Sequence, residues 1–156
     1  MTGKVITRFS GPHAFLSNFY ESPVLYEGRI WLTVEHAFQA AKTTLAEQKD
    51  LIQRCETPGR AKKLGRRVRL RSNWDDIRVG VMLHLLQLKF MEPAFAEMLL
   101  QTGRAQLVEG NTWGDRFWGV CDGEGQNWLG RLLMVTRQHL EDGELRIQLR
   151  YGDLKL

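Results

Sequence analysis

Helix start and stop signals recur along the chain from Thr33 onward, and they constrain the fold more than any other feature. Thr33, Thr57 and Asn73 are suitable N-cap residues, and the proline after Thr57 suits the first position of a helix. Gly65 and Gly103 are typical of helix ends. These signals predict helices at about residues 33–44, 46–54, 58–65, 74–91, 93–103 and 129–140.

Strand signals are confined to the N-terminal part of the chain. Residues 4–9 alternate like an edge strand, and Val24–Tyr26 and Arg29–Trp31 flank a Glu-Gly turn, which predicts a hairpin. The sequence therefore predicts a mainly α protein, a single multi-helical domain over residues 1–156 with a small N-terminal β element. We expect its core to span about residues 9–140 and a charged tail to cover residues 141–156.

Apolar residues on the long helix predicted at 74–91 recur at helical spacing. The positions that we expect to face the core are Ile77, Val81, Leu85 and Leu88.

The first predicted helix brings three polar side chains to one side. At about 100° per residue, Gln39 and Lys42 lie within about 40° of Glu35 around the helix axis. Glu35 and Lys42 are about 10.5 Å apart along that axis, too far for a tight ion pair but suitable for two groups that flank a bound molecule. Glu35 also lies in the first turn, where the helix dipole stabilises a carboxylate, so a purely structural role stays open.

Composition narrows the class of protein. The chain has 156 residues and is 43% hydrophobic, which suits one globular domain, and no apolar run approaches the roughly 20 residues that cross a bilayer. The two cysteines, Cys55 and Cys121, and the four scattered histidines show neither a disulfide framework nor metal-ligand spacing. We therefore expect a cytoplasmic protein with no signal peptide, no membrane association, no metal and no cofactor.

Positive charge is concentrated in one segment, residues 60–71. It contains no acidic residue and seven basic ones, namely Arg60, Lys62, Lys63, Arg66, Arg67, Arg69 and Arg71. One basic surface on an otherwise mildly acidic chain favours an anionic partner, and phosphate is the obvious candidate. A solvated helix face is the alternative interpretation.

Two further segments hold polar and aromatic residues that a hydrophobic core alone does not need. In Phe15–Tyr20, aromatic rings that can stack on a flat ligand stand beside Asn18, whose amide can read a polar edge or simply stabilise a turn. Between Glu109 and Gly130, glycines allow a close approach of the backbone to a ligand, and Trp113 and Trp118 supply flat apolar walls. A carboxylate in this second segment could instead cap a turn.

These segments together resemble the signature of the NADAR family, also described as YbiA-like. The resemblance covers about residues 9–140 in the expected order. It rests on Phe15–Tyr20, Glu27-Gly28, Val34–Lys42, Ala61–Arg66, Trp74-Asp75, Met82, Lys89-Phe90, Leu99–Gly103, Leu107–Glu109, Asp115, Trp118-Gly119, Asn127–Met134 and Arg137. One departure is the stretch from Glu109 to Asp115, which is one residue longer than in the family's commonest form.

The resemblance implies N-glycosidase chemistry on a mainly helical fold. Family members cleave a bond between a nitrogen and the anomeric carbon of a ribose. Some act on phosphoribosylated riboflavin-pathway intermediates, and others remove ADP-ribose from modified guanine in nucleic acid. For this chain we therefore expect an N-glycosidase that acts on an ADP-ribosyl or ribosyl-phosphate substrate, with reversal of DNA or RNA ADP-ribosylation as the first candidate. An ADP-ribosyltransferase would then be its functional partner.

Roles for individual residues follow from this hypothesis. Glu35 would stabilise positive charge at C1 or activate water, and Lys42 would attack C1 and form a Schiff base with the ring-opened ribose. Asp115 would bind ribose hydroxyls or assist proton transfer, with Glu109 as its partner. The expected substrate-binding residues are Asn18, Phe19, Tyr20, Gln39, Arg66, Trp74, Trp118, Gly119, Asn127 and Gly130.

Two other classes of function use the same residues. A non-catalytic ADP-ribose or NAD sensor would use this site for affinity alone. A nucleic-acid-binding module would depend on the basic residues 60–71 and would bind unmodified DNA or RNA with a strong salt dependence.

Overall fold

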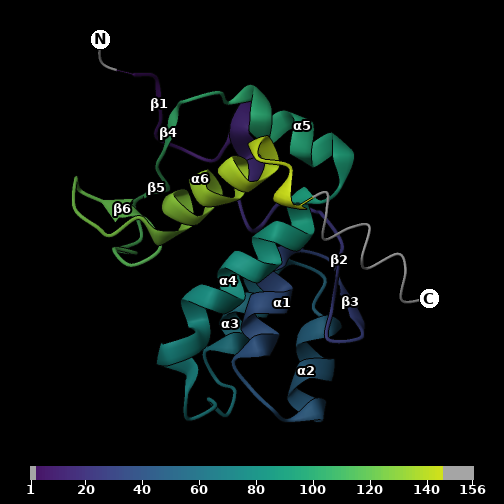
Figure 1. Ribbon diagram of the computed structural model, residues 1–156. Helices are drawn as coiled ribbons and strands as arrows, with labels where there is room; N and C mark the ends of the chain where they lie inside the picture. The colour runs from purple at the N-terminus through teal and green to yellow at the C-terminus, as the bar shows by residue number, and fades with distance from the viewer. Residues whose placement is uncertain (1–2, 146–156) are drawn as a thin grey trace. The chain divides into compact units, whose positions relative to one another are not determined.

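The computed structural model describes residues 3–145 (Figure 1). Within them, six α-helices and one 3-10 helix account for most of the regular structure, and the strands are two or three residues long. The predicted mainly α fold with a small β element is therefore confirmed. The chain divides into two compact units, which we describe separately. One unit comprises residues 18–89 and the other comprises residues up to 17 together with those from 90 onward.

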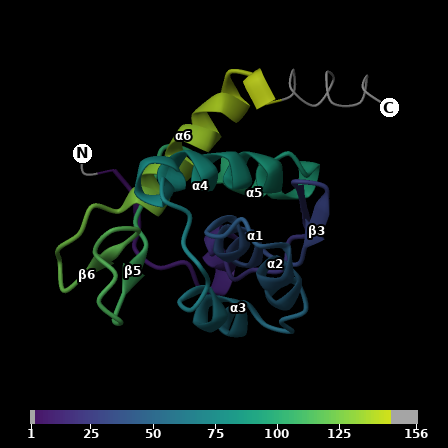
Figure 2. The same cartoon turned by 90° about the horizontal axis from the view of Figure 1, so that it is seen from below.

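The 18–89 unit is built around α1 (Val34–Ala41). The hairpin of β2 (Val24–Tyr26) and β3 (Arg29–Trp31) precedes this helix, as predicted. Helix α1 packs on both α2 (Ala46–Gln53) and α3 (Pro58–Gly65), so that all eight of its residues are buried. Both views show α1 beside these two helices (Figures 1 and 2).

A glycine permits the close contact between α1 and α3. A side chain at Gly65 would overlap the amide of Gln39 on α1, because the Cβ atom would coincide with the space that this amide fills. Gly65 therefore has a packing role in addition to its position at the end of α3.

Helix α4 (Trp74–Phe90) faces the core with a set of residues that shares only Leu85 with the predicted one. Met82, Leu85, Leu86 and Lys89 are buried, whereas Ile77, Val81 and Leu88 are only partly covered. The buried face is thus rotated from the predicted stripe, and it contains a lysine, which a search for apolar residues does not select.

The other unit combines short strands with two packed helices. Strand β1 (Val5–Ile6) pairs in parallel with β4 (Gln106–Leu107), and β5 (Gly110–Asn111) pairs in parallel with β6 (Val120–Cys121). Helix α6 (Trp128–Glu141) packs on α5 (Pro93–Gln101) and on β4. Arg137 of α6 strengthens this packing, because its guanidinium donates to Thr102 Oγ1 at 2.7 Å and to the Ala105 carbonyl at 3.0 Å.

Several element boundaries differ from the predicted ones. The strand expected at residues 4–9 is reduced to Val5–Ile6, and it is followed by a 3-10 helix, η1 (Gly11–Leu16), which was not predicted. The first helix ends at Ala41, so Lys42 is its C-cap. Of the predicted charged tail, residues 146–156 lie outside the described residues. That residues 1–156 form a single domain stays a prediction.

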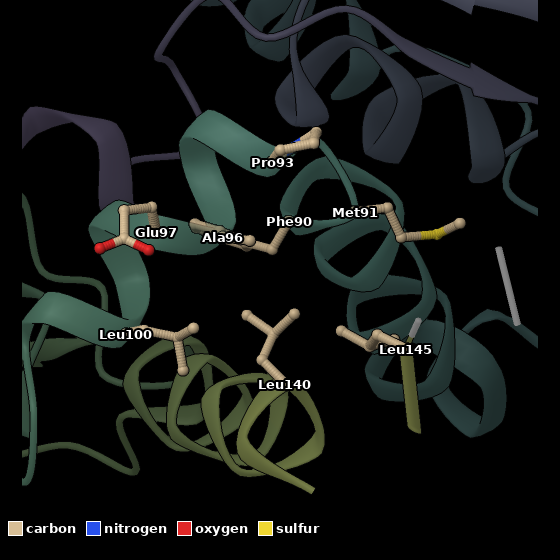
Figure 3. A pocket seen from close by; sticks show the side chains of 8 residues that line it. All are labelled: Phe90, Met91, Pro93, Ala96, Glu97, Leu100, Leu140 and Leu145. Atoms are coloured by element: carbon tan, nitrogen blue, oxygen red, sulfur yellow. The ribbon is translucent and has the colours of Figure 1, made fainter. Parts of the chain in front are cut away.

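An apolar cavity of about 330 Å³ lies in the second of these units (Figure 3). Side chains from the end of α4, from α5 and from α6 converge on it, and among the described residues of its lining Glu97 is the one with a charged side chain. Such a lining suits packing better than the recognition of a phosphorylated sugar. Across residues 3–145, no helix combines the length and the apolar character needed to cross a bilayer.

Candidate active site

The N-terminus of α1 places Glu35 in a buried position. Thr33 caps this helix, because its Oγ1 accepts a hydrogen bond from the His36 amide at 3.2 Å and lies 2.8 Å from His36 Nδ1. The Glu35 amide donates to the Asn18 carbonyl at 3.1 Å, which attaches the start of the helix to the aromatic loop before the hairpin. A carboxylate at this position is stabilised by the helix dipole although it is largely removed from water.

Two buried side-chain amides, those of Gln39 and Asn18, belong to the same unit as this carboxylate. Gln39 Nε2 donates to Glu35 Oε1 at 2.6 Å, and Asn18 Nδ2 donates to Met82 Sδ at 3.4 Å. The Oε1 atom of Gln39 and the Oδ1 atom of Asn18 have no hydrogen-bond partner among the described residues. A buried acceptor without a hydrogen-bond partner destabilises the fold. These two oxygens are therefore suited to accept hydrogen bonds from the hydroxyl groups of a ligand.

Lys42 extends the same face of α1 with an amine of lowered pKa. Burial is the largest cause of the lower pKa, and the nearby charges of Arg66 and Lys62 lower it further, whereas Glu35 opposes the shift. These influences place Arg66, the predicted phosphate-binding residue, in the electrostatic neighbourhood of Lys42. The geometry thus brings together the carboxylate, the amide, the amine and one arginine that the sequence singles out.

The aromatic candidates divide into exposed and buried rings. Phe19 is 43% exposed and Tyr20 is 40% exposed, with the Lys62 and Lys89 amines 5.8 Å and 5.9 Å from their respective ring centres. Trp74 is only 5% exposed and packs on Phe38, with ring centres 5.1 Å apart. Phe19 and Tyr20 therefore offer faces on which a base can stack, while the ring of Trp74 belongs to the core of this unit.

Lys89 is a buried charged residue that the sequence pattern does not single out as a site residue. It is 2% exposed, and burial lowers its pKa to about 7. Its spacing along the sequence could have indicated its burial. Lys89 follows Met82 by seven residues, and residues at this spacing share a helix face.

Lys89 is expected to make stability depend on pH. Its pKa is about 7 in the folded protein and near 10.5 in the unfolded chain, so between these values the unfolded chain binds more protons. The free energy of unfolding should therefore rise with pH in this window, by at most about 1.4 kcal/mol per unit. Lys89→Met should flatten this rise in chemical denaturation measured between pH 7 and pH 10, whereas Lys63→Met, at an exposed position, should not. Equal slopes for Lys89→Met and the wild type would contradict the assignment.

In the other unit, Asn127 and Gly130 hold the segment that carries Glu109. Asn127 Oδ1 accepts from the Glu109 amide at 3.0 Å, and Asn127 Nδ2 donates to the Leu107 carbonyl at 2.9 Å. A side chain at Gly130 would overlap the Leu107 carbonyl and the Asn127 amide. These contacts show that Asn127 and Gly130, both predicted as substrate-binding residues, position the backbone around Glu109.

Gly119 and Asp115 shape the loop that follows Glu109. The Val120 amide donates to the Glu109 carbonyl at 2.8 Å, and a side chain at Gly119 would overlap that carbonyl. Asp115 Oδ1 accepts from the amides of Phe117 and Trp118 at 3.1 and 2.9 Å. This oxygen of Asp115 therefore caps a turn, the alternative that the sequence leaves open, and Trp118 packs edge-on against Phe117.

The predicted site residues thus fall into two groups. Asn18, Phe19, Tyr20, Glu35, Gln39, Lys42, Arg66 and Trp74 belong to the 18–89 unit, and Glu109, Asp115, Trp118, Gly119, Asn127 and Gly130 belong to the other unit. Among residues 3–145, no three histidine, cysteine, aspartate or glutamate side chains form a group that could hold a metal ion.

Comparison with known proteins yields one family and several relatives. The model of the NADAR domain matches residues 7–141. A riboflavin biosynthesis protein of Vibrio vulnificus is 37% identical over 134 residues, which are 83% of this chain but only 36% of that protein. N-glycosidase YbiA of Escherichia coli K12 is 38% identical over 135 residues, 84% of each chain. The NMR structure of Escherichia coli YbiA has a TM-score of 0.81 at 36% identity and covers 93% of this chain and 89% of that one.

Proposed function

The chain belongs to the NADAR family and is an N-glycosidase, and we propose that it releases ADP-ribose from modified guanine in nucleic acid or from a related ADP-ribosyl substrate. The observation that carries this proposal is the group formed by buried Glu35 and Gln39 on α1 and half-buried Lys42 at its C-cap. A carboxylate, an unsatisfied amide oxygen and an amine of lowered pKa on one helix face suit the attack on a ribose C1.

Glu35 is the residue that we expect to stabilise the reacting sugar. Cleavage of the nitrogen–C1 bond leaves positive charge on C1 and on the ring oxygen, and a buried carboxylate stabilises such charge strongly. The leaving nitrogen keeps the electron pair of the broken bond and takes up a proton.

Lys42 is the proposed nucleophile. Because its pKa is lowered, a larger share of its amine is neutral near pH 7 than for an exposed lysine. The neutral amine forms a bond to C1, the ribose ring opens to an imine, and water hydrolyses this imine to return the free amine and the sugar.

Phosphate recognition is assigned to the basic residues that surround Lys42. Arg66 and Lys62 influence the pKa of Lys42, and both belong to the basic segment 60–71. A guanidinium suits a diphosphate because it offers several donors in a fixed plane. These basic residues favour a phosphorylated sugar over a simple nucleoside as the substrate.

The activity is tested by incubating purified protein with oligonucleotides that carry ADP-ribosylated guanine, with NAD and with a phosphoribosyl-amine. We expect mass spectrometry to show restored guanine and free ADP-ribose from the oligonucleotide, with less turnover of the other two compounds. Release of products from the phosphoribosyl-amine alone would overturn the proposed substrate. Binding of ADP-ribose without any released base would indicate a sensor, and salt-dependent binding of unmodified DNA alone would indicate a nucleic-acid-binding module.

A second candidate substrate is a phosphoribosylated intermediate of riboflavin synthesis. The similarity to a riboflavin biosynthesis protein of Vibrio vulnificus favours it, although this chain matches only 36% of that protein's length. The same Glu35 and Lys42 chemistry applies, because this bond also joins a nitrogen to C1 of a ribose phosphate.

We also propose a cytoplasmic location and a functional pairing with an ADP-ribosyltransferase. The free thiols of Cys55 and Cys121 support a reducing compartment. An enzyme that removes ADP-ribose needs another enzyme to attach it. Co-expression of this protein with a candidate transferase should therefore lower the amount of ADP-ribosylated nucleic acid.

A further inference from the structure

His36, the neighbour of Glu35 on α1, is a fully buried imidazole that the proposed mechanism does not use. Its exposed fraction is 0%, and both ring nitrogens contact groups of the same unit. Nδ1 lies 2.8 Å from Thr33 Oγ1, and Nε2 lies 2.9 Å from the Cys55 carbonyl oxygen. Because both nitrogens are engaged inside the protein, this ring does not suit the role of a general acid or base toward a substrate.

The two contacts assign the tautomer of the ring. A carbonyl oxygen only accepts hydrogen bonds, so Nε2 carries a proton and donates it to Cys55. The Thr33 hydroxyl accepts from the His36 amide at 3.2 Å, and its own proton can point to Nδ1. A neutral imidazole that is protonated on Nε2 thus satisfies the Thr33 hydroxyl, the Cys55 carbonyl and both ring nitrogens.

The two contacts differ in their reach along the chain. Thr33 precedes His36 by three residues, so this contact stays within the first turn of α1. Cys55 is 19 residues away and follows the end of α2, where its amide donates to the Ile52 carbonyl at 3.1 Å. The hydrogen bond from Nε2 therefore ties the first turn of α1 to the end of α2.

Glu35 belongs to the turn that is tied in this way. Successive residues of a helix point about 100° apart, so the side chain of His36 can bind the end of α2 while that of Glu35 points elsewhere. The Glu35 amide is held by the Asn18 carbonyl and its carboxylate by Gln39, and His36 adds a tie to a second helix. A shift of this turn would move the carboxylate, and a displacement of about 1 Å can lower a rate by about a hundredfold.

We propose that His36 is a positioning residue for Glu35, because its Nε2–H anchors the first turn of α1 to the end of α2 and so fixes the place of the carboxylate. This inference rests on the role of Glu35 in the proposed function. Glu35 stabilises the cation of the transition state more than it stabilises the bound substrate. Loss of the anchor should therefore lower kcat and leave KM nearly unchanged.

Two amide substitutions separate the contacts of the ring. The side-chain amide of glutamine reaches the position of Nε2, whereas that of asparagine reaches the position of Nδ1. His36→Gln can therefore keep the hydrogen bond to the Cys55 carbonyl, and His36→Asn can keep only the contact with Thr33. We expect His36→Asn to lower kcat at least about tenfold with little change in KM, and His36→Gln to retain most of the kcat of the wild type.

A buried threonine of the other unit provides the control. Thr136→Val removes the hydrogen bond that Thr136 Oγ1 donates to the Leu132 carbonyl at 2.9 Å, and it should leave kcat unchanged. Rates are measured well below the lowest melting temperature of the variants, on whichever of the ADP-ribosylated oligonucleotide, NAD and the phosphoribosyl-amine the wild type hydrolyses. A merely structural His36 would lower the melting temperature without changing the kcat of the folded enzyme. Wild-type kcat in folded His36→Asn, or equal losses of kcat in both His36 variants, would overturn the proposal.

Nitrogen-15 NMR of the wild-type imidazole tests the anchor without any turnover. We expect a proton on Nε2 and none on Nδ1, with slow exchange of the Nε2 proton because the ring is buried. A proton on Nδ1 instead would overturn the proposal, and this result does not require His36→Asn to fold. If the wild type hydrolyses none of the three compounds, the proposed function fails, while the spectrum still decides whether the anchor exists. If the wild type is active and both folded His36 variants match its kcat, the positioning role fails alone.

Discussion

Replacing Glu35 with glutamine is expected to lower the turnover of the ADP-ribosyl substrate by at least about a hundredfold, while the fold is retained. The amide keeps the shape of the side chain and can still accept the hydrogen bond from Gln39. It carries no charge, so it cannot stabilise the cation that forms at C1 as the bond to nitrogen breaks. The measurement is kcat for the released base, followed by chromatography or mass spectrometry.

The chain offers a matched control for this substitution. Glu47 lies in the first turn of α2, as Glu35 lies in the first turn of α1, but it is exposed. Glu47→Gln should therefore leave kcat close to that of the wild type, because it removes a helix-terminal charge without touching the buried face. If Glu35→Gln turned over substrate at a near-normal rate, Glu35 would have no part in the mechanism.

Lys42→Arg is expected to abolish covalent trapping and to lower turnover to a similar degree. Arginine keeps the positive charge but supplies no neutral amine near pH 7. Borohydride added to wild-type enzyme and substrate should reduce the imine and increase the mass of the peptide that contains Lys42 by the reduced ribosyl group. Lys63→Arg, at an exposed lysine of the neighbouring α3, should still give the adduct.

The pH dependence of turnover gives a second measurement on Lys42. Only the neutral amine attacks C1, so the rate should rise with pH until the amine is deprotonated. Because burial and the nearby cations lower the pKa of Lys42, this rise should end below the ordinary range of a lysine. An active enzyme that gives no adduct, or a Lys42→Arg variant that turns over well, would favour direct attack by water assisted by Glu35.

Short-range signals are sufficient to predict most of the fold. Thr33 and Thr57 cap α1 and α3 as predicted, and Pro58 opens α3, because these preferences act within one turn of helix. The hairpin of β2 and β3 has the predicted bounds for the same reason. Local sequence signals do not predict structure that depends on distant partners. The length of strand β1, for example, is set by its pairing with β4, and η1 was likewise not predicted.

Helical periodicity alone likewise places Glu35, Gln39 and Lys42 on one face of the predicted helix. The chemical properties of these side chains, however, depend on their burial. Helix α1 lies against α2 and α3, and the missing side chain of Gly65 lets α3 approach Gln39. The lowered pKa of Lys42 and the unsatisfied oxygen of Gln39 follow from that packing, which spacing along one helix cannot reveal.

The sequence by itself determined the helices, the hairpin and the placement of Glu35, Gln39 and Lys42 on one face, because caps, turns and helical repeat are local properties of the chain. Tertiary structure decided which polar groups lose water and which merely hold the backbone. It buried Lys89 on a face of α4 that is rotated from the predicted apolar stripe. It also engaged Asn127 with the backbone at Glu109 and Leu107, because a side-chain amide binds whichever backbone groups the fold brings within hydrogen-bond distance.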